Sequence, residues 1–164
     1  MTKKTTVICP GSFDPVTLGH MDIIGRAAAM FDKVIVAVLV NSSKKPVFTA
    51  QERISLLKKA LADFDNVEVQ SFDGLLVDYA RQVGADAVVR GLRAVSDFEY
   101  EFQMSLTNKK LYPELETIFL TTRSEYMFLS SSIVKQIAVL GGDITNFVPE
   151  CIHDEIKTGL LEKR

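Results

Sequence analysis

The sequence contains few cysteines and no long apolar run. Cys9 and Cys151 lie far apart and form neither a CxxC pair nor a metal-ligand spacing. This pattern favours a reducing, cytoplasmic location. No apolar run approaches the roughly 18 residues that a membrane span needs, and the stretch Val7–Cys9 is too short for the apolar part of a signal peptide. We therefore expect no membrane partner.

The chain also lacks a strong excess of one charge. Its 19 Lys and Arg against 21 Asp and Glu give a net charge of −2. This balance disfavours a protein that coats nucleic acid, although it leaves room for a local basic patch. The apolar share of 47% and the charged share of 24% are ordinary for a globular protein and exclude disorder or a coiled-coil rod. With 164 residues, we expect a single domain, 1–164, that needs no disulfide or metal staple.

Short apolar runs alternate with segments of helical spacing along the chain. The apolar runs predict strands over 5–9, 34–40, 67–72, 87–89 and 117–120. Helical spacing covers 19–31, a segment opened by a Thr49–Glu52 capping box, 75–83, 97–111, 132–140 and a last helix from Pro149. Alternating strands and helices imply right-handed crossovers, so we predict an α/β fold with a doubly wound, five-stranded parallel sheet of order 3-2-1-4-5 and C-terminal helices.

The three longest irregular stretches, 41–48, 90–96 and 121–131, each follow a predicted strand. In open α/β sheets the ligand binds beyond the carboxyl ends of the strands, where the strand order reverses. For this order the reversal lies between the first and fourth strands. We therefore expect the loops 10–20 and 90–96 to face each other across a cleft.

The loop 10–20 lacks two common nucleotide-binding motifs. It contains neither GxGxxG nor GxxxxGK[ST], which disfavours a dinucleotide dehydrogenase and a P-loop ATPase. It does contain Ser12, and His20 at a predicted helix N-terminus, a place that suits phosphate. The alternative for His20 is a histidine that only caps its helix.

Three further loops carry groups that suit anions. Lys44 and Lys45 follow the second strand, and Arg90 and Arg93 flank Gly91 after the fourth. Three serines, Ser130–Ser132, precede a helix that carries Lys135. Each set has a plainer alternative as solvated surface charge or as a helix cap. Asp14, Glu99 and Glu101 are candidate metal or ribose partners, although a capping or surface role is the simpler interpretation of Glu99.

Taken together, four anion-friendly loops at strand carboxyl ends form a stronger signal than any one of them. No G-x-S-x-G motif and no nucleophile–base pair accompany them. The set favours chemistry by positioning and charge stabilisation, as phosphoryl transfer requires, over covalent catalysis.

Four runs carry a specific resemblance in order along the chain: GSFDPVTLGH (11–20), SSKKP (42–46), RGLRAVSDFEYE (90–101) and SSSIVK (130–135). Together they resemble the bacterial phosphopantetheine adenylyltransferases. The first run is similar to the T/HxGH motif of the wider nucleotidylyltransferase superfamily, and the RGLR run separates this family from its relatives. The resemblance spans nearly the whole chain and implies a Rossmann-like domain, a Mg²⁺-dependent reaction and a homohexamer.

The resemblance also implies roles for individual residues. His20 stabilises the transition state and acts with Lys44 and Ser12. On the acceptor side it implies Ser12, Lys44, Leu76 and Arg90. On the ATP side it implies Ser12, Phe13, His20, Gly91, Leu92, Arg93, Glu101, Tyr126, Met127, Phe128, Leu129, Ser130, Ser131 and Ser132. No protein ligand for Mg²⁺ is implied, since the metal is held mainly by phosphates. Two positions depart from the common pattern: Leu18 replaces an Asn, and Tyr126 stands where many members have Trp.

The implied reaction is reversible transfer of the adenylyl group from ATP to 4′-phosphopantetheine in coenzyme A biosynthesis. It gives dephospho-coenzyme A and pyrophosphate by in-line attack, without a covalent intermediate. Coenzyme A is a candidate feedback ligand. Two alternatives stay open: another nucleotidylyltransferase with a different acceptor, and a non-catalytic sensor that binds adenylates.

Helix 97–111 carries three aromatic residues, Phe98, Tyr100 and Phe102. Positions 98 and 100 point about 200° apart on a helix, so one face cannot bury all three against its own sheet. Tyr100 is therefore a candidate contact with another subunit. Its alternative is to lie over its own surface with the hydroxyl in water. The family resemblance favours assembly.

Overall fold

The computed structural model describes residues 4–40 and 45–163. Its core is one five-stranded parallel sheet with the strand order β3-β2-β1-β4-β5. The strands are β1 (Thr6–Gly11), β2 (Lys33–Val40), β3 (Val67–Asp73), β4 (Ala87–Leu92) and β5 (Glu116–Thr121). This confirms the predicted fold class and strand order. The reversal of strand order falls between β1 and β4, as expected.

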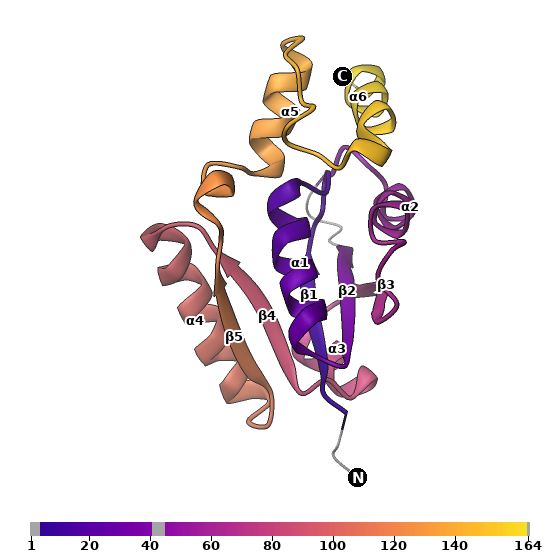
Figure 1. Ribbon diagram of the computed structural model, residues 1–164. Coiled ribbons are helices and arrows are strands. Elements are labelled where there is room, and N and C mark those ends of the chain that lie inside the picture. The colour runs from indigo at the N-terminus through magenta and orange to yellow at the C-terminus, as the bar shows by residue number, and fades with distance from the viewer. Residues whose placement is uncertain (1–3, 41–44, 164) are drawn as a thin grey trace.

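Helices cover both faces of the sheet (Figure 1). They are α1 (Leu18–Met30), α2 (Ala50–Ala60), α3 (Leu76–Val83), α4 (Val95–Leu111), α5 (Ser131–Val139) and α6 (His153–Glu162), with short 3₁₀ turns η1 (Ser124–Tyr126) and η2 (Glu150–Ile152). Helices α5 and α6 stand beyond the carboxyl ends of the central strands (Figure 1). No helix in the described part of the chain is both long and apolar enough to cross a membrane.

The central strands are buried on both faces. Val34 and Val36 of β2 point into a core that α1, α2, α5 and α6 share, whereas Ile35 points into a second core closed by α3. A strand covered on both sides has no polar face, which explains the continuous apolar run of β2.

The capping box predicted at the start of α2 is confirmed. The hydroxyl of Thr49 accepts a hydrogen bond from the Glu52 amide at 3.2 Å, and the Glu52 carboxylate accepts one from the Thr49 amide at 2.8 Å. These two bonds satisfy amide groups that the helix itself leaves unpaired.

The fourth strand is longer than its apolar run predicts. Arg90 and Gly91 pair in register with Phe119 and Leu120 of β5, so the expected loop 90–96 shrinks to the two residues between β4 and α4. Gly91 permits this close packing, since a Cβ at this position would lie 2.9 Å from Cγ1 of Ile23 on α1. Pairing with the neighbouring strand thus extends β4 into residues that sequence pattern alone assigns to a loop.

Helix α4 presents its apolar residues outward. Phe98, Phe102 and Leu106 are 43%, 46% and 55% exposed, respectively. All of α4 lies in the described part of the chain, and none of its residues is buried. Its half-buried positions include Asp97 and Glu101, which turn toward β4 and the residues that follow it. Phe98 packs edge-to-face against Phe119 of β5, with 6.2 Å between ring centroids, but the apolar stripe of this helix stays about half exposed.

We predict that adjacent leucines of α6 differ sharply in their effect on stability. Leu160 is 2% exposed in the core, whereas its neighbour Leu161 is 42% exposed. Leu160→Ala should lower the free energy of unfolding by about 2–5 kcal/mol because it leaves a cavity. Leu161→Ala should cost about 1 kcal/mol or less. Urea unfolding of the two variants checks this, and equal losses would contradict the placement of α6.

Candidate active site

A cavity of about 470 Å³ opens at the carboxyl ends of β1 and β4. Its lining comes from the loop after β1, the start of α1, the end of β4, the first turns of α4, and the segment that leads into α5. The prediction that the loop 10–20 faces the residues after the fourth strand is confirmed. The volume lies within the usual range for small-molecule sites, about 300–1,000 Å³.

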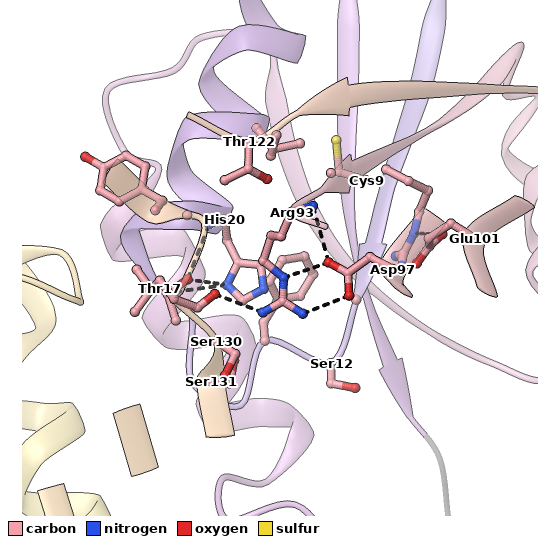
Figure 2. Close-up of a pocket in the computed structure, with 18 of the residues that line it drawn as sticks. Cys9, Ser12, Thr17, His20, Arg93, Asp97, Glu101, Thr122, Ser130 and Ser131 are labelled. Atoms are coloured by element: carbon pink, nitrogen blue, oxygen red, sulfur yellow. Dashed lines mark hydrogen bonds and ion pairs between the residues drawn. The ribbon is translucent and has the colours of Figure 1, made fainter. Parts of the chain in front are cut away.

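His20 occupies the start of α1 and takes part in an unusual helix cap (Figure 2). The hydroxyl of Thr17 accepts a hydrogen bond from the His20 amide at 3.4 Å. In return, the Thr17 amide donates to Nδ1 of the His20 ring at 3.0 Å. Because Nδ1 is an acceptor here, the proton of the neutral ring sits on Nε2.

The surroundings of His20 keep its ring neutral. Burial, followed by the positive charges of Arg90 and Arg93, lowers the pKa of His20 from 6.5 to about 4. Phe13 packs against the ring with 5.0 Å between centroids. At neutral pH the side chain is therefore a hydrogen-bond donor through Nε2 and carries no charge.

Each of the two arginines is held by a carboxylate from α4. Arg90 forms a two-pronged pair with Glu101, at 2.8 Å from Nε to Oε2 and 2.6 Å from Nη2 to Oε1, and also donates to the carbonyl of Pro10. Arg93 pairs in the same way with Asp97 and also donates from Nη1 to the carbonyl of Leu129 at 3.0 Å. It lowers the pKa of the Asp97 carboxyl against the opposing effect of burial. These bonds fix both guanidinium planes and leave each arginine two N–H groups free of these partners.

The serines at the start of α5 have different hydrogen-bond partners. Ser130 caps the helix by accepting a hydrogen bond from the Ile133 amide at 3.2 Å. Ser131 donates to the carbonyl of Pro15 at 2.7 Å, which ties α5 to the loop after β1. Both serines line the cavity (Figure 2), whereas Ser132 is exposed outside its lining. Lys135 forms an ion pair with Asp14 at 3.1 Å.

Comparison with known proteins places this geometry in a family. The family model described as cytidylyltransferase-like matches residues 8–137. A phosphopantetheine adenylyltransferase of Heliobacterium modesticaldum is 57% identical over 90% of this chain and 88% of its own. One from Caldanaerobacter subterraneus subsp. tengcongensis is 60% identical over 91% of this chain and 93% of its own. The chain belongs to the phosphopantetheine adenylyltransferase family.

Solved structures with low identity share the fold of this family member. One from Vibrio parahaemolyticus, described as a nicotinate-nucleotide adenylyltransferase, has a TM-score of 0.71 at 18% identity and covers 99% of this chain and 98% of its own. A lipopolysaccharide core biosynthesis protein of Thermoplasma volcanium has a TM-score of 0.57 at 19% identity and covers 74% of this chain and all of its own. At these identities the likeness supports the Rossmann-like fold alone.

Most positions that the family resemblance implies gather at the cavity. Those that line it are Ser12, Phe13, His20, Arg90, Gly91, Arg93, Glu101, Tyr126, Leu129, Ser130 and Ser131. Those outside its lining are Leu76, Leu92, Met127, Phe128 and Ser132. Leu76 is the first residue of α3, and the side chains of Met127 and Phe128 are about half exposed. Lys44 lies outside the described residues.

Sequence reasoning missed three residues that the structure brings to the cavity. Thr17 fixes the ring of His20, Asp97 holds Arg93, and Tyr100 lines the wall. Arg93 precedes α4, which begins at Val95, so helical spacing gave no signal for its pair with Asp97. The cap at Thr17 was hidden because the expected partner at its third helical position is Glu or Gln rather than His.

The carboxylates at the cavity are already engaged. Asp97 and Glu101 each bind an arginine. Across residues 4–40 and 45–163, no group of three or more His, Cys, Asp or Glu side chains is placed to hold a metal ion.

Burial also affects Cys9, which lines the same cavity. Removal from water raises the pKa of its thiol to about 12, against a smaller opposing effect of Arg90. The thiol therefore stays protonated and is a poor nucleophile at neutral pH.

We predict that His20 makes the stability of the protein depend on pH below neutrality. Its folded pKa of about 4 lies below its unfolded value of 6.5. Below pH 6.5 the unfolded chain binds a proton at this ring that the folded protein does not. The free energy of unfolding therefore declines as the pH falls from 6.5 toward 4, by up to roughly 3 kcal/mol. His20→Asn keeps an acceptor for the Thr17 amide and cannot titrate, so it is the matched control. Urea unfolding at pH 7, 6, 5 and 4.5 measures the difference between the two proteins. A difference that stays constant with pH would contradict this environment of His20.

Proposed function

We propose that this chain transfers the adenylyl group of ATP to 4′-phosphopantetheine, reversibly, giving dephospho-coenzyme A and pyrophosphate. The proposal is carried by one observation: a neutral histidine, His20, and two pre-positioned arginines, Arg90 and Arg93, surround a single cavity in this family's fold. These groups donate hydrogen bonds or carry positive charge. They suit the binding of phosphates and the stabilisation of charge on a phosphoryl group.

The chemistry needs no nucleophile from the protein. An oxygen of the acceptor phosphate attacks the α-phosphorus of ATP in line and forms the new P–O bond. The bond from the α-phosphorus to the bridging oxygen breaks, and pyrophosphate leaves with the electron pair. Two anions must be held close together, so the protein's contribution is placement and charge neutralisation. The absence of a reactive thiol at Cys9 is consistent with this mechanism.

His20 has the properties that charge stabilisation requires. Its Nε2 carries the proton, since Nδ1 accepts from Thr17. We infer that Nε2–H donates to an oxygen of the α-phosphoryl group as negative charge grows there. Because the ring is neutral, it acts as a fixed hydrogen-bond donor that does not change its protonation during the reaction.

The two arginines divide between the substrates in this proposal. Arg90 and Ser12, with Lys44, serve the acceptor phosphate, and Leu76 lies along the pantetheine. Arg93 and Ser130 serve the β- and γ-phosphates of ATP. Mg²⁺ supplies further neutralisation when it is bound to the triphosphate. The donor set fits such a metal held by phosphate oxygens, because Asp97 and Glu101 are committed to arginines. Coenzyme A shares the parts of the product and is proposed as a competing ligand at this cavity.

We also infer a cytoplasmic location for the activity. Cys9 and Cys151 are both free thiols, as a reducing compartment favours.

An acceptor panel tests the function. Pyrophosphate release is measured with ATP, Mg²⁺ and each of 4′-phosphopantetheine, nicotinate mononucleotide and simple phosphate monoesters. We expect turnover with 4′-phosphopantetheine and formation of dephospho-coenzyme A in equal amount. Faster turnover with another acceptor would identify a different nucleotidylyltransferase. Binding of ATP without turnover on any acceptor would favour a sensor.

Removal of the His20 ring should act on the chemical step. We predict that His20→Ala lowers kcat by about 10²–10³, the usual cost of losing a transition-state hydrogen-bond donor. The affinity for ATP should change far less. His153→Ala is the matched control, since the other histidine of the chain begins α6, away from the cavity lining. A near-normal kcat in His20→Ala would overturn the role given to this residue.

We further propose that the chain assembles with copies of itself into a hexamer, with α4 at an interface. Phe98, Phe102 and Leu106 form an exposed apolar stripe on this helix, with the first two rings stacked at 5.5 Å. Exposed apolar stripes of this kind favour burial against a partner. The inner side of α4 is occupied by Asp97 and Glu101, so the helix cannot turn this stripe fully inward without breaking both arginine pairs.

Sedimentation tests the assembly. We predict that the wild type is larger than an 18.2 kDa monomer and that Phe102→Asp shifts it toward smaller species, because a charge would be desolvated in the interface. Phe102 is used in place of Tyr100, since Tyr100 lines the cavity. Leu75→Asp is the control: Leu75 is 57% exposed on another helix, at a helix N-cap position that tolerates Asp. A wild-type monomer would refute the oligomer.

A further inference from the structure

Two charged side chains beside the cavity are almost completely buried and have no part in the mechanism above. Asp14 is 5% exposed and Arg53 is 3% exposed. Neither lines the cavity. Burying a charge is costly unless hydrogen bonds compensate it, so the contacts of these two residues show what they hold in place.

Arg53 reaches from α2 to three backbone carbonyls. Its Nη1 donates to the carbonyl of Ser12 at 2.7 Å and to that of Leu39 at 3.2 Å, and its Nε donates to Phe48 at 3.1 Å. Ser12 follows β1, and Leu39 lies at the end of β2. One guanidinium therefore joins the carboxyl ends of both central strands to the segment that enters α2.

Asp14 completes the same connection from the other side. Its Oδ1 accepts from the Phe48 amide at 2.8 Å and its Oδ2 accepts from the Val47 amide at 3.0 Å. Lys135 of α5 donates to Oδ2 at 3.1 Å. The carboxylate thus ties the loop after β1 to the segment before α2 and to the helix beyond the strands.

Phe13 lies between the Ser12 carbonyl that Arg53 binds and Asp14, and its backbone is strained. Phe13 has a φ of 49°, a backbone conformation that residues other than glycine seldom adopt. The carbonyl before it is bound by Arg53, and the carboxylate after it is bound by two amides and a lysine. The ring that this conformation directs inward packs against His20, 5.0 Å between centroids. Arg53 and Asp14 consequently constrain both Ser12 and the wall against which His20 rests.

We propose that Arg53 and Asp14 are positioning residues for the reaction: they hold the Ser12–Phe13 turn, and through it Ser12 and the ring of His20, in the geometry that adenylyl transfer needs. The inference rests on the proposed function of this cavity. It assigns these residues no contact with substrate. Displacing a reacting group by about 1 Å can cost up to ~10²-fold in rate.

Arg53→Lys is the first test, because it keeps the charge and cannot span three carbonyls with one planar fork. We expect kcat to fall roughly 10- to 100-fold, while the KM for ATP changes by less than about threefold. Asp14→Asn is the second variant. One of its two side-chain atoms becomes a donor, so it cannot accept from both the Val47 and Phe48 amides, and we expect the same pattern. Arg81→Lys is the matched control, since Arg81 donates to the carbonyl of Leu111 away from the cavity.

Titration of each protein with ATP by calorimetry separates positioning from loss of folded enzyme. In a positioning role, the number of ATP sites per chain and the Kd stay at wild-type values while kcat per site falls. If kcat falls only in proportion to the number of sites, or stays at the wild-type value per site, the inference is overturned. Should Arg53→Lys not accumulate as folded protein, Asp14→Asn decides the matter. A wild type that is inactive with 4′-phosphopantetheine would instead refute the proposed function.

Discussion

The reciprocal cap between Thr17 and His20 is the constraint on which the candidate site depends. It satisfies two amides at the start of α1 and at the same time occupies Nδ1 of the imidazole. A helix cap thereby fixes the tautomer and the orientation of the imidazole that lines the cavity. The usual residues at this position of a capping box are Glu and Gln, and the charge of a Glu would repel the phosphates of the proposed reaction. A neutral histidine closes the helix without that repulsion.

A second constraint operates at α4. Asp97 and Glu101 occupy the inward face of this helix and orient Arg93 and Arg90, respectively. Its apolar residues Phe98, Phe102 and Leu106 are consequently left about half exposed on the outer side. The arginine pairs at the site and the exposed stripe thus both follow from the same rotation of α4 about its own axis.

Sequence pattern predicted the strand order and the capping box of α2, because apolar periodicity and local hydrogen-bonding rules decide these features. It failed where contacts between distant segments decide. The continuation of β4 through Arg90 depends on pairing with β5, and the outward stripe of α4 depends on ion pairs to β4 and the residues after it. The roles of Asp14 and Arg53 were likewise hidden. The hydrogen-bond partners of these two residues lie from 5 to 121 residues away in sequence, so no local sequence motif predicts the contacts.

The low pKa of His20 matters because the proposed reaction would bring phosphate charges close to its ring. Arg90 and Arg93 contribute to the value of about 4 even though each is paired with a carboxylate, so their field reaches the ring. Bound phosphates act in the opposite direction and favour the protonated ring. An increase of about 2 in that pKa still leaves the imidazole mostly neutral at pH 7. A histidine with a pKa of 6.5 would be protonated at pH 7 after the same increase, and it would then be able to lose its proton to the leaving group. In the proposed mechanism, burial beside two arginines therefore keeps His20 a neutral hydrogen-bond donor throughout the reaction, and the inferred task of Asp14 and Arg53 is to hold that donor in place.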